Sequence, residues 1–262
     1  MNPVIFQTSI FTLYTLWIFI AVAILATTYS ISKLSTKKGL KLQFLSDNSW
    51  MIFFYGLIGA RVIAIISNLN IYFHEFSFSA FFNLFAIWDK GLSVWGALIG
   101  ACLYLYKICK EKEDQDFFKW LDVIVPSVIL GLAISHIGAF FDGMSYGRET
   151  GLPWGVNFEN SAIKYAVPIH PTQIYAFLYA TAIYIVSQMT NFEKTGYTSI
   201  GAIGIYAFFR LLEEFVRGDD TWMVGFIRLP QIFAFLVFVA SIVVLYKRRP
   251  KGSTELPNHD KK

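Results

Sequence analysis

One short segment of the chain spaces an aromatic hydroxyl, two guanidinium groups and a carboxylate at helical intervals. In IYAFFRLLEEFVRGDD the steps through Tyr206, Arg210, Glu214 and Arg217 are four, four and three residues, so these side chains share one face of a helix. A guanidinium group binds phosphate oxygens in a bidentate way, and a carboxylate at this spacing pairs with it and fixes its orientation. The segment therefore predicts a cationic, hydrogen-bonding surface that suits a phosphate group.

A second polar stretch, SHIGAFFDGMSYGRETGLPWGVNF, occupies residues 135–158 between two apolar runs and continues to YAVPIHPTQIY. Irregular backbone at membrane depth survives only when it is buried in protein or lines a wet cavity. A long loop of this kind is more often functional than not. Arg61 and His136 also lie within or at the ends of apolar runs, although a single such residue could equally be a paired structural charge.

These residues belong to a chain of 262 residues whose composition is that of a membrane protein. Apolar residues make up 55% of it and charged residues 15%, against roughly 25% charged residues in ordinary soluble domains. Seven apolar runs are candidate transmembrane helices. They cover residues 10–30, 50–67, 92–106, 120–139, 172–189, 198–216 and 230–246. We therefore expect an all-α integral membrane protein with about seven transmembrane helices.

The basic residues indicate the orientation of the chain, because cytoplasmic loops retain lysine and arginine. The segments that follow the first, third, fifth and seventh apolar runs hold 15 of the 22 basic residues. This alternation predicts an amino terminus outside, a cytoplasmic carboxyl terminus and an odd number of spans. The aromatic stretch 68–91 and the stretch after the fourth run are then interfacial segments on the outer side of the membrane.

We expect residues 1–247 to form one integral-membrane domain and residues 248–262 a basic cytoplasmic tail. A formal charge of +4, with cations gathered at span ends, fits membrane anchoring better than nucleic-acid binding. Cys102 and Cys109 are seven residues apart, which argues against a disulfide, and two thiols alone make a poor metal site. Since no P-loop or dinucleotide motif occurs, the sequence predicts no cofactor, no metal and no nucleic-acid partner.

Four motifs, in this order, resemble those of the prolipoprotein diacylglyceryl transferase family: WDKGLSVWGALIGA, HIGAFFDGMSYGRETGLPWGVNF, VPIHPTQIYA and YAFFRLLEEFVRGDD. The resemblance implies a seven-span enzyme of the bacterial inner membrane, with residues 1–247 as the transferase domain. It also implies the first step of lipoprotein maturation, in which diacylglyceryl moves from phosphatidylglycerol to the lipobox cysteine thiol of a prolipoprotein signal peptide. The expected partners are therefore phosphatidylglycerol, the prolipoprotein and the lipid bilayer.

The chain departs from the family pattern at three positions. Many members carry histidine, arginine and asparagine where this chain has Trp95, His136 and Ala139. A neutral histidine donates one hydrogen bond, whereas arginine offers five donors and a permanent charge. These departures keep open a second hypothesis, a divergent homologue that has lost activity or uses a different lipid donor. A transporter is the third, and it is disfavoured because the charges gather toward the outer side and no repeat is visible.

The resemblance and the needs of thiol chemistry assign roles to residues. A free cysteine is only a few per cent thiolate at neutral pH, so a base or a positive field must help. His170 is the first candidate base and His136 the second, although a helix cap is the structural alternative for His170. We expect Arg210, supported by Tyr206 and Glu214, to stabilise the charge on the leaving phosphate. The residues expected to bind substrate are His136, Arg61, Asp142, Gly143, Gly147, Gln173, Tyr175 and Arg217.

Overall fold

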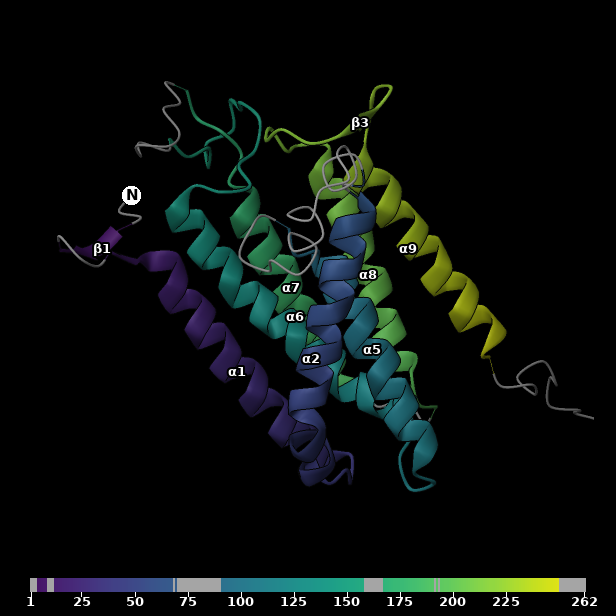
Figure 1. Ribbon diagram of the computed structural model, residues 1–262. Helices are drawn as coiled ribbons and strands as arrows, with labels where there is room; N and C mark the ends of the chain where they lie inside the picture. Colours follow the sequence, from purple (N-terminus) through teal and green to yellow (C-terminus); the bar gives the residue numbers. More distant parts are fainter. Residues whose placement is uncertain are drawn as a thin grey trace, which may run out of the picture. The chain divides into compact units, whose positions relative to one another are not determined.

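The computed structural model describes residues 4–8, 12–67, 69, 91–157, 167–190, 192 and 194–249. These residues contain seven helices and two short antiparallel hairpins (Figure 1). The helices are α1 (Thr15–Lys37), α2 (Leu42–Ser67), α5 (Val94–Glu111), α6 (Phe117–Asp142), α7 (Thr172–Met189), α8 (Tyr197–Glu214) and α9 (Leu229–Lys247). One hairpin pairs β1 (Val4–Gln7) with β2 (Thr12–Tyr14), and the other pairs β3 (Met223–Val224) with β4 (Ile227–Arg228). Most of the predicted interfacial segment 68–91 and tail residues 250–262 lie outside the described residues.

Each of the seven predicted apolar runs overlaps one helix, although the ends differ by up to eight residues, as in α2. The first helix begins at Thr15 and not near residue 10, because the residues before it form the β1–β2 hairpin. Four helices, α1, α2, α6 and α9, combine the length and the apolar composition needed to cross a membrane. The other three have 18 residues each, about 27 Å at 1.5 Å per residue, but more polar side chains. The protein is a helical membrane protein, while seven spans and the orientation stay predictions.

Large apolar side chains lie exposed along these helices. Leu25 of α1 is 70% exposed and Phe53 of α2 is 64% exposed, and many others resemble them. Water-soluble proteins rarely expose contiguous apolar surface on this scale. Such surfaces are what helices present to lipid chains.

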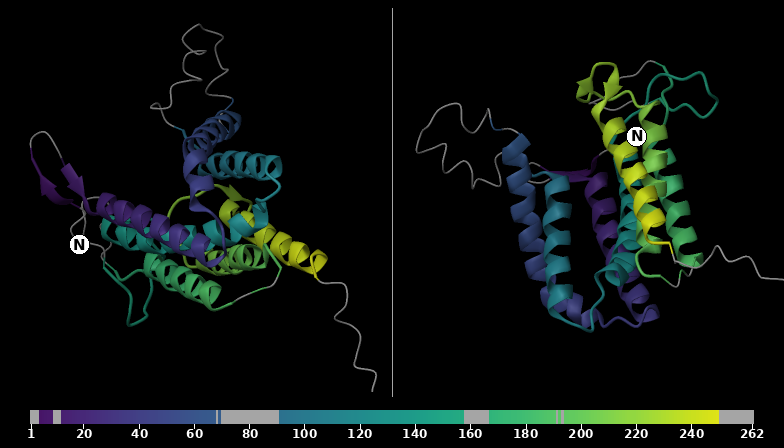
Figure 2. Two further views of the ribbon diagram at one scale, coloured as in Figure 1. Left: turned by 90° about the horizontal axis from the view of Figure 1, so that it is seen from below. Right: turned by 90° about the vertical axis from the view of Figure 1, so that its right-hand side faces the viewer.

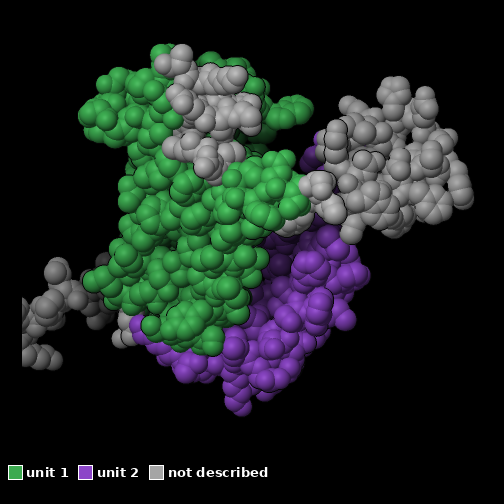
Figure 3. Space-filling model, turned by 90° about the vertical axis from the view of Figure 1, so that its left-hand side faces the viewer, with its two compact units in different colours: residues 1–34, 121–262 green, residues 35–120 purple. Residues whose placement is uncertain are grey.

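The chain divides into two compact units (Figure 3). The small unit, residues 35–120, holds α2 and α5. These two helices bring their main chains together, since a Cβ added to Gly59 would lie 2.3 Å from the carbonyl oxygen of Gly96. Small residues permit such close helix packing in membranes. The prediction that residues 1–247 act as a single domain stays a prediction.

The large unit, residues 1–34 and 121–262, packs α1, α6 and α7 through small and hydroxyl-bearing side chains. The Ser30 hydroxyl of α1 lies 2.9 Å from that of Ser127 on α6 and 3.1 Å from that of Tyr184 on α7. Figures 1 and 2 show α1 and α6 side by side along their length. A buried cluster then joins α6, α7 and α8, and it consists of Ile129, Ala133, Ala176, Tyr179, Ala180, Ile183 and Ala202.

Helix α8 of the large unit is fixed by contacts along its length. Asp122 of α6 accepts hydrogen bonds of 2.8 Å from the main-chain N–H groups of Gly196 and Ser199, which satisfies donors at the start of α8. Farther along, α9 approaches closely, because a Cβ added to Gly204 would lie 2.9 Å from the Ser241 Cβ. These contacts position the end of α8, which carries Arg210 and Glu214 of the predicted polar stripe.

Candidate active site

Glu214, the last residue of α8, is surrounded by three guanidinium groups. Its side chain is fully buried, with Oε1 2.5 Å from Arg210 Nη2 and 3.5 Å from Arg217 Nε. Its Oε2 accepts a hydrogen bond of 2.8 Å from Arg228 Nε. A buried carboxylate needs such partners, because removing them leaves an uncompensated charge in a medium of low dielectric constant. The predicted pairing of Arg210 with Glu214 therefore exists, within a larger network.

Glu213, the residue before it, binds two of the same arginines. Its Oε1 accepts a hydrogen bond of 2.5 Å from Arg210 Nη1 and one of 3.3 Å from Arg217 Nη1. Its Oε2 accepts a hydrogen bond of 2.8 Å from the Tyr179 hydroxyl on α7. Arg210 is thus held by two carboxylates, one on each terminal nitrogen. This arrangement fixes the plane of its guanidinium group.

Asp219 completes the network beyond the end of α8. Its carboxylate accepts hydrogen bonds from Arg217 Nε at 2.8 Å, from Arg217 Nη2, and from Arg228 Nη2 at 3.1 Å. Burial opposes ionisation of Asp219, but the hydrogen bond and charge of Arg217, with the charge of Arg228, hold the pKa of this carboxyl below its ordinary value. Because Arg228 is the last residue of β4, the network ties the β3–β4 hairpin to α8.

The formal charges of this network cancel, since it contains three guanidinium groups and three carboxylates. Its arginines differ in exposure: the Arg210 side chain is 25% exposed, against 9% each for Arg217 and Arg228. A guanidinium group carries five N–H donors, and Glu213 and Glu214 each contact one terminal nitrogen of Arg210. Arg210 is therefore the most accessible cation of the network to an incoming anion.

The glycine-rich loop after α6 pairs with the segment after α8. Arg148 N donates to Val216 O at 2.8 Å, and Gly218 N donates to Tyr146 O at 3.0 Å. The Arg148 side chain adds a hydrogen bond of 3.1 Å from Nε to Arg217 O. Figure 1 shows this loop and the β3–β4 hairpin at the same end of the helices of the large unit. The predicted polar stretch 135–158 therefore adjoins the arginine network.

Gly147 brings the same loop against His170. Gly147 N donates to His170 O at 3.1 Å, and His170 N donates to Arg148 O at 2.9 Å. A Cβ added to Gly147 would lie 2.4 Å from His170 Cβ, so only glycine fits this approach. Gly147 also pairs with Arg217 in an isolated antiparallel β-bridge. The main chain of one loop therefore contacts both His170 and the arginine network.

The His170 ring contacts α7 through an aromatic hydroxyl. Its Nδ1 lies 3.1 Å from the Tyr175 hydroxyl, which also accepts a hydrogen bond of 2.7 Å from Trp154 Nε1. Among the described residues, no hydrogen bond reaches Nε2 of His170. The capping alternative for His170 is not observed, because Pro171 stands at the start of α7 and no side chain caps that helix.

Two side chains of α7 hold the turn between α6 and the loop. Thr172 Oγ1 donates to Ser145 O at 2.5 Å, and Gln173 Nε2 donates to Met144 O at 2.6 Å. The turn needs a left-handed backbone at Gly143, where φ is +77°, a conformation that glycine adopts without strain. It follows directly on Asp142, the last residue of α6. The Oε1 atom of Gln173 is buried and has no hydrogen-bond partner among the described residues.

Three predicted residues lie outside these contacts. The Tyr206 ring on α8 packs edge-on against Tyr179, with ring centroids 5.3 Å apart. His136 on α6 is half-buried, and its Nε2 has no hydrogen-bond partner in the described part of the chain. Arg61 belongs to the small unit, where its buried guanidinium group donates to Gly91 O at 3.2 Å. A role for Arg61 in the site stays a prediction.

The predicted polar stripe ends earlier than expected, and four members of the network were missed from sequence. Helix α8 ends at Glu214, so Arg217 reaches the carboxylates from the segment beyond it. Glu213 could have been found, since it lies three residues after Arg210 and four before Arg217. Arg228 enters from a hairpin, and no local periodicity predicts that contact. The missed residues are Tyr179, Glu213, Asp219 and Arg228.

Metal-binding clusters were also sought. The described residues contain no group of three or more histidine, cysteine, aspartate or glutamate side chains that could hold a metal ion. Cys102 is exposed and Cys109 is buried, both on α5, and both are free thiols. The chemistry available at the end of α8 is therefore that of guanidinium, carboxylate, imidazole and hydroxyl groups.

Comparison with known proteins identifies the family. The family model described as prolipoprotein diacylglyceryl transferase matches residues 3–247. A phosphatidylglycerol–prolipoprotein diacylglyceryl transferase of Clostridium tetani is 31% identical over 248 residues, which cover 93% of this chain and 96% of the relative. Proteins of the same name from Prochlorococcus marinus and Cutibacterium acnes are 26% and 29% identical; the alignments cover 87% and 75% of this chain and 85% and 69% of those relatives. With its four long apolar helices, the chain is a multi-pass membrane protein that belongs to the prolipoprotein diacylglyceryl transferase family.

Proposed function

We propose that this protein transfers the diacylglyceryl group of phosphatidylglycerol to the thiol of the lipobox cysteine in a prolipoprotein signal peptide, the first step of lipoprotein maturation. Its relatives carry the two substrates in their names. The observation that carries the proposal in this chain is the guanidinium group of Arg210, which is partly exposed and oriented by Glu213 and Glu214. A fixed planar cation of this kind binds and stabilises phosphate oxygens.

The proposal includes seven spans in a bacterial inner membrane, with the amino terminus outside and the carboxyl terminus in the cytoplasm. Seven helices that coincide with seven apolar runs support it, together with the basic residues after alternate runs. In this topology residues 1–247 are the transferase domain and residues 248–262 a cytoplasmic tail. The Glu214 end of α8 then faces the periplasm, where a secreted preprotein emerges.

The reaction exchanges one bond for another at a glycerol carbon. The cysteine sulfur attacks the carbon that bears the phosphate, a C–S thioether bond forms and the C–O bond breaks. The electron pair of that bond leaves with glycerol phosphate, and the thiol proton passes to a base. Arg210 contacts the phosphate and stabilises the negative charge that develops on it, Glu214 orients Arg210, and Tyr206 lines the site beside Tyr179.

His170 is the proposed base. Its Nδ1 lies beside the Tyr175 hydroxyl, so an Nδ1–H group donated to Tyr175 leaves the lone pair of Nε2 free to take the thiol proton. Trp154 fixes the same hydroxyl from the other side. Gly147 sets the position of His170 relative to Arg217 and hence to the network.

Two buried polar atoms suggest how the protein binds the glycerol headgroup. Gln173 Oε1 and His136 Nε2 have no hydrogen-bond partner among the described residues, and the headgroup of phosphatidylglycerol supplies hydroxyl donors. Asp142 and Gly143 belong to the turn that Gln173 holds, and Tyr175 and Arg217 are the further residues that we assign to substrate binding. Arg61 is the remaining proposed lipid contact.

His136 also favours a second candidate, a family member with a changed lipid donor. It stands where the family pattern has arginine, and its Nε2 has no hydrogen-bond partner in the described part of the chain. A permanent cation is therefore replaced by a side chain that suits a less anionic or differently hydroxylated headgroup. The headgroup preference of the purified protein distinguishes the two candidates.

The test uses the purified protein in vesicles with a lipobox peptide that contains cysteine, and a matched peptide with serine in its place. We expect phosphatidylglycerol to add one diacylglyceryl mass to the cysteine peptide and none to the serine peptide, as measured by mass spectrometry. Modification with another phospholipid, and not with phosphatidylglycerol, supports the second candidate. No modification with any phospholipid contradicts both.

A further inference from the structure

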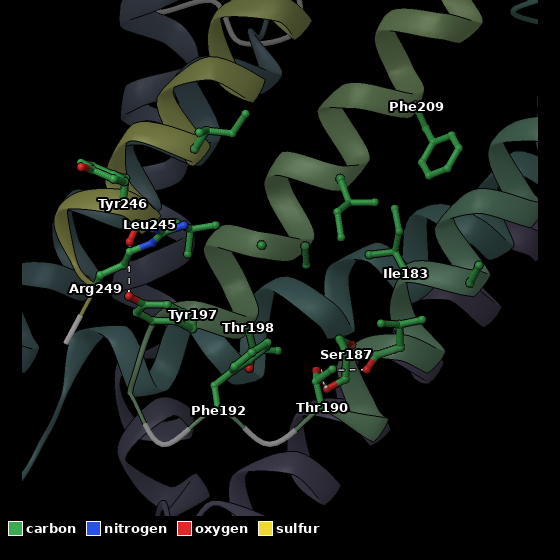
Figure 4. A pocket seen from close by; sticks show the side chains of 16 residues that line it. Ile183, Ser187, Thr190, Phe192, Tyr197, Thr198, Phe209, Leu245, Tyr246 and Arg249 are labelled. Atoms are coloured by element: carbon green, nitrogen blue, oxygen red, sulfur yellow. Dashed lines mark hydrogen bonds between the residues drawn. The ribbon is translucent and has the colours of Figure 1, made fainter. Parts of the chain in front are cut away.

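A groove of about 570 Å³ runs between α7, α8 and α9, within the large unit (Figure 4). Its walls come from α7 near Ile183, from α8 between Thr198 and Phe209, and from the last turns of α9. Several wall residues, including Val186 and Ile205, are about half exposed, so the groove opens to the outside of the helix bundle. The volume lies within the range of about 300–1,000 Å³ typical of small-molecule sites.

The walls of this groove offer hydrocarbon contacts and almost no hydrogen bonds. Main-chain oxygens accept hydrogen bonds from three of its five hydroxyl groups, and the other two belong to Thr198 and Tyr246. Ser187 Oγ donates to Tyr184 O at 2.6 Å, and Thr190 Oγ1 donates to Val186 O at 3.1 Å. The Tyr197 hydroxyl donates to Leu245 O at 3.2 Å, as Figure 4 shows. A ligand that enters between these walls therefore makes mainly apolar contacts, as an acyl chain does.

The dimensions of the groove suit one acyl chain. From Tyr197 to Phe209 the wall follows α8 for about 18 Å at 1.5 Å per residue. One leaflet of a bilayer contributes about 15 Å of hydrocarbon. Gly201 makes the space on the α8 side, because a Cβ added there would meet no atom within 4 Å.

One end of the groove is basic. Arg249 lines it and places its guanidinium group over the Tyr246 ring, 5.1 Å from the ring centroid. Lys194 is close by, since its Nζ donates to Arg248 O. Neither Arg249 nor Lys194 forms an ion pair with a carboxylate in the described part of the chain. Basic pockets between transmembrane helices on the cytoplasmic side of a membrane bind anionic lipid headgroups.

We infer that the groove between α7, α8 and α9 is a binding site for an anionic phospholipid, with one acyl chain between the helices and the headgroup phosphate at Arg249. The site is separate from the arginine network around Glu214, which carries the proposed reaction. It binds a lipid of the leaflet at the Tyr197 end of α8. The inference does not depend on the proposed transfer activity.

Photolabelling tests the inference. The full-length protein is reconstituted in phosphatidylcholine vesicles with a trace of phosphatidylglycerol or phosphatidylcholine that carries a diazirine at the end of one acyl chain. Illumination, digestion and mass spectrometry then locate the label. We expect groove peptides from α7, α8 and α9 to be labelled about fivefold more by the anionic probe, the preference expected of one basic residue near an anionic lipid.

Substitutions at Gly201 and Arg249 identify the groove as the source of the label. Gly201→Leu fills the open space and should abolish labelling of the groove peptides, whereas Gly201→Ala, which adds one methyl group, should retain it. Arg249→Gln should reduce labelling by the anionic probe to the level of the neutral probe. Arg210→Lys should leave the groove label unchanged, which separates this site from the proposed donor site.

Two results would overturn the inference. Equal labelling by both probes would mean that the groove holds ordinary surrounding lipid without headgroup selection. Labelling that persists in Gly201→Leu would place the lipid outside the groove. If Gly201→Leu does not fold, the comparison of Arg249→Gln with the wild type still decides the headgroup question. Absence of transfer activity with intact groove labelling would contradict the proposed function and leave this inference standing.

Discussion

The two ends of α8 carry charge in different ways. At the Glu214 end, three arginines meet three carboxylates within ion-pair distance, and their charges cancel. At the Tyr197 end, Arg249 lines an apolar groove and Lys194 donates to the neighbouring Arg248 O. Neither forms an ion pair with a carboxylate among the described residues. In the proposed roles both ends bind phosphate groups, and the carboxylates at the first end orient its guanidinium groups.

The difference separates chemistry from simple lipid binding. A cation that only attracts an anionic headgroup needs charge and access, and it remains free to move. A cation that stabilises charge in a transition state must already be in position, which requires partners that fix it. Glu213 and Glu214 supply those partners to Arg210, whereas the contact given to the Arg249 guanidinium group by the described residues is the Tyr246 ring.

Among the substitutions that test the difference between the two ends of α8, removal of the Glu214 carboxylate should have the largest effect on stability and activity. Glu214→Gln leaves Arg210, Arg217 and Arg228 without their shared counter-charge, and breaking a buried ion pair costs about 3–5 kcal/mol of stability. We expect a large fall in melting temperature and loss of transfer activity. The control is Glu111→Gln, because Glu111 forms an exposed 3.9 Å pair with Lys107, and such pairs are worth at most about 1 kcal/mol. Equal melting temperatures for the two variants would contradict the network.

Arg228 should act as a positioning residue for Glu214. Arg228→Gln removes a hydrogen bond between charged groups, worth about 1.5–3 kcal/mol, so kcat should fall about 10- to 100-fold. The KM for the lipid should change little, since Arg228 is buried and its guanidinium group binds Glu214 and Asp219. Arg228→Lys should restore part of kcat. A variant that melts earlier but turns over at the normal rate would show that Arg228 only anchors the hairpin.

Gly147 should affect transfer activity because its main chain contacts His170. In Gly147→Ala the new methyl group would lie 2.4 Å from His170 Cβ, and overpacking of this kind costs about 1–3 kcal/mol. We expect transfer activity to fall about tenfold because His170 is displaced. Gly151→Ala is the matched control in the same loop, since its Cβ would meet no atom within 4 Å. Similar activity in both variants would separate His170 from the reaction.

The smallest expected effect is a pH dependence that arises from Asp219. The pKa of Asp219 is lower in the folded than in the unfolded chain, so its ionised form stabilises the fold above the unfolded pKa. This contribution is lost as the pH falls through the folded pKa. The difference in melting temperature between the wild type and Asp219→Asn should be constant above about pH 5 and shrink in more acidic solution. A difference that grows on acidification would contradict this assignment.

The helices and the pairing of Arg210 with Glu214 were predictable because they depend on local patterns. Apolar runs located the seven helices that the structure describes, and the spacing of Arg210 and Glu214 placed both on one face of α8. The contact of Gly147 with His170 depends on two loops that meet in the folded chain. Both loops could be predicted from the sequence, but their contact with each other could not. The hydrogen bond from Arg228 to Glu214 requires the β3–β4 hairpin to pack against the end of α8. No periodic pattern in the sequence predicts that packing.

The most direct test of the central claim is the rate of diacylglyceryl transfer by Arg210→Lys. Lysine keeps the positive charge but lacks the planar group that Glu213 and Glu214 hold by its two terminal nitrogens. Single-turnover transfer from phosphatidylglycerol to a lipobox peptide should slow by about 100-fold or more, the loss typical of one transition-state donor. Transfer by Arg210→Lys at the wild-type rate would contradict the claim that an oriented guanidinium group carries the reaction.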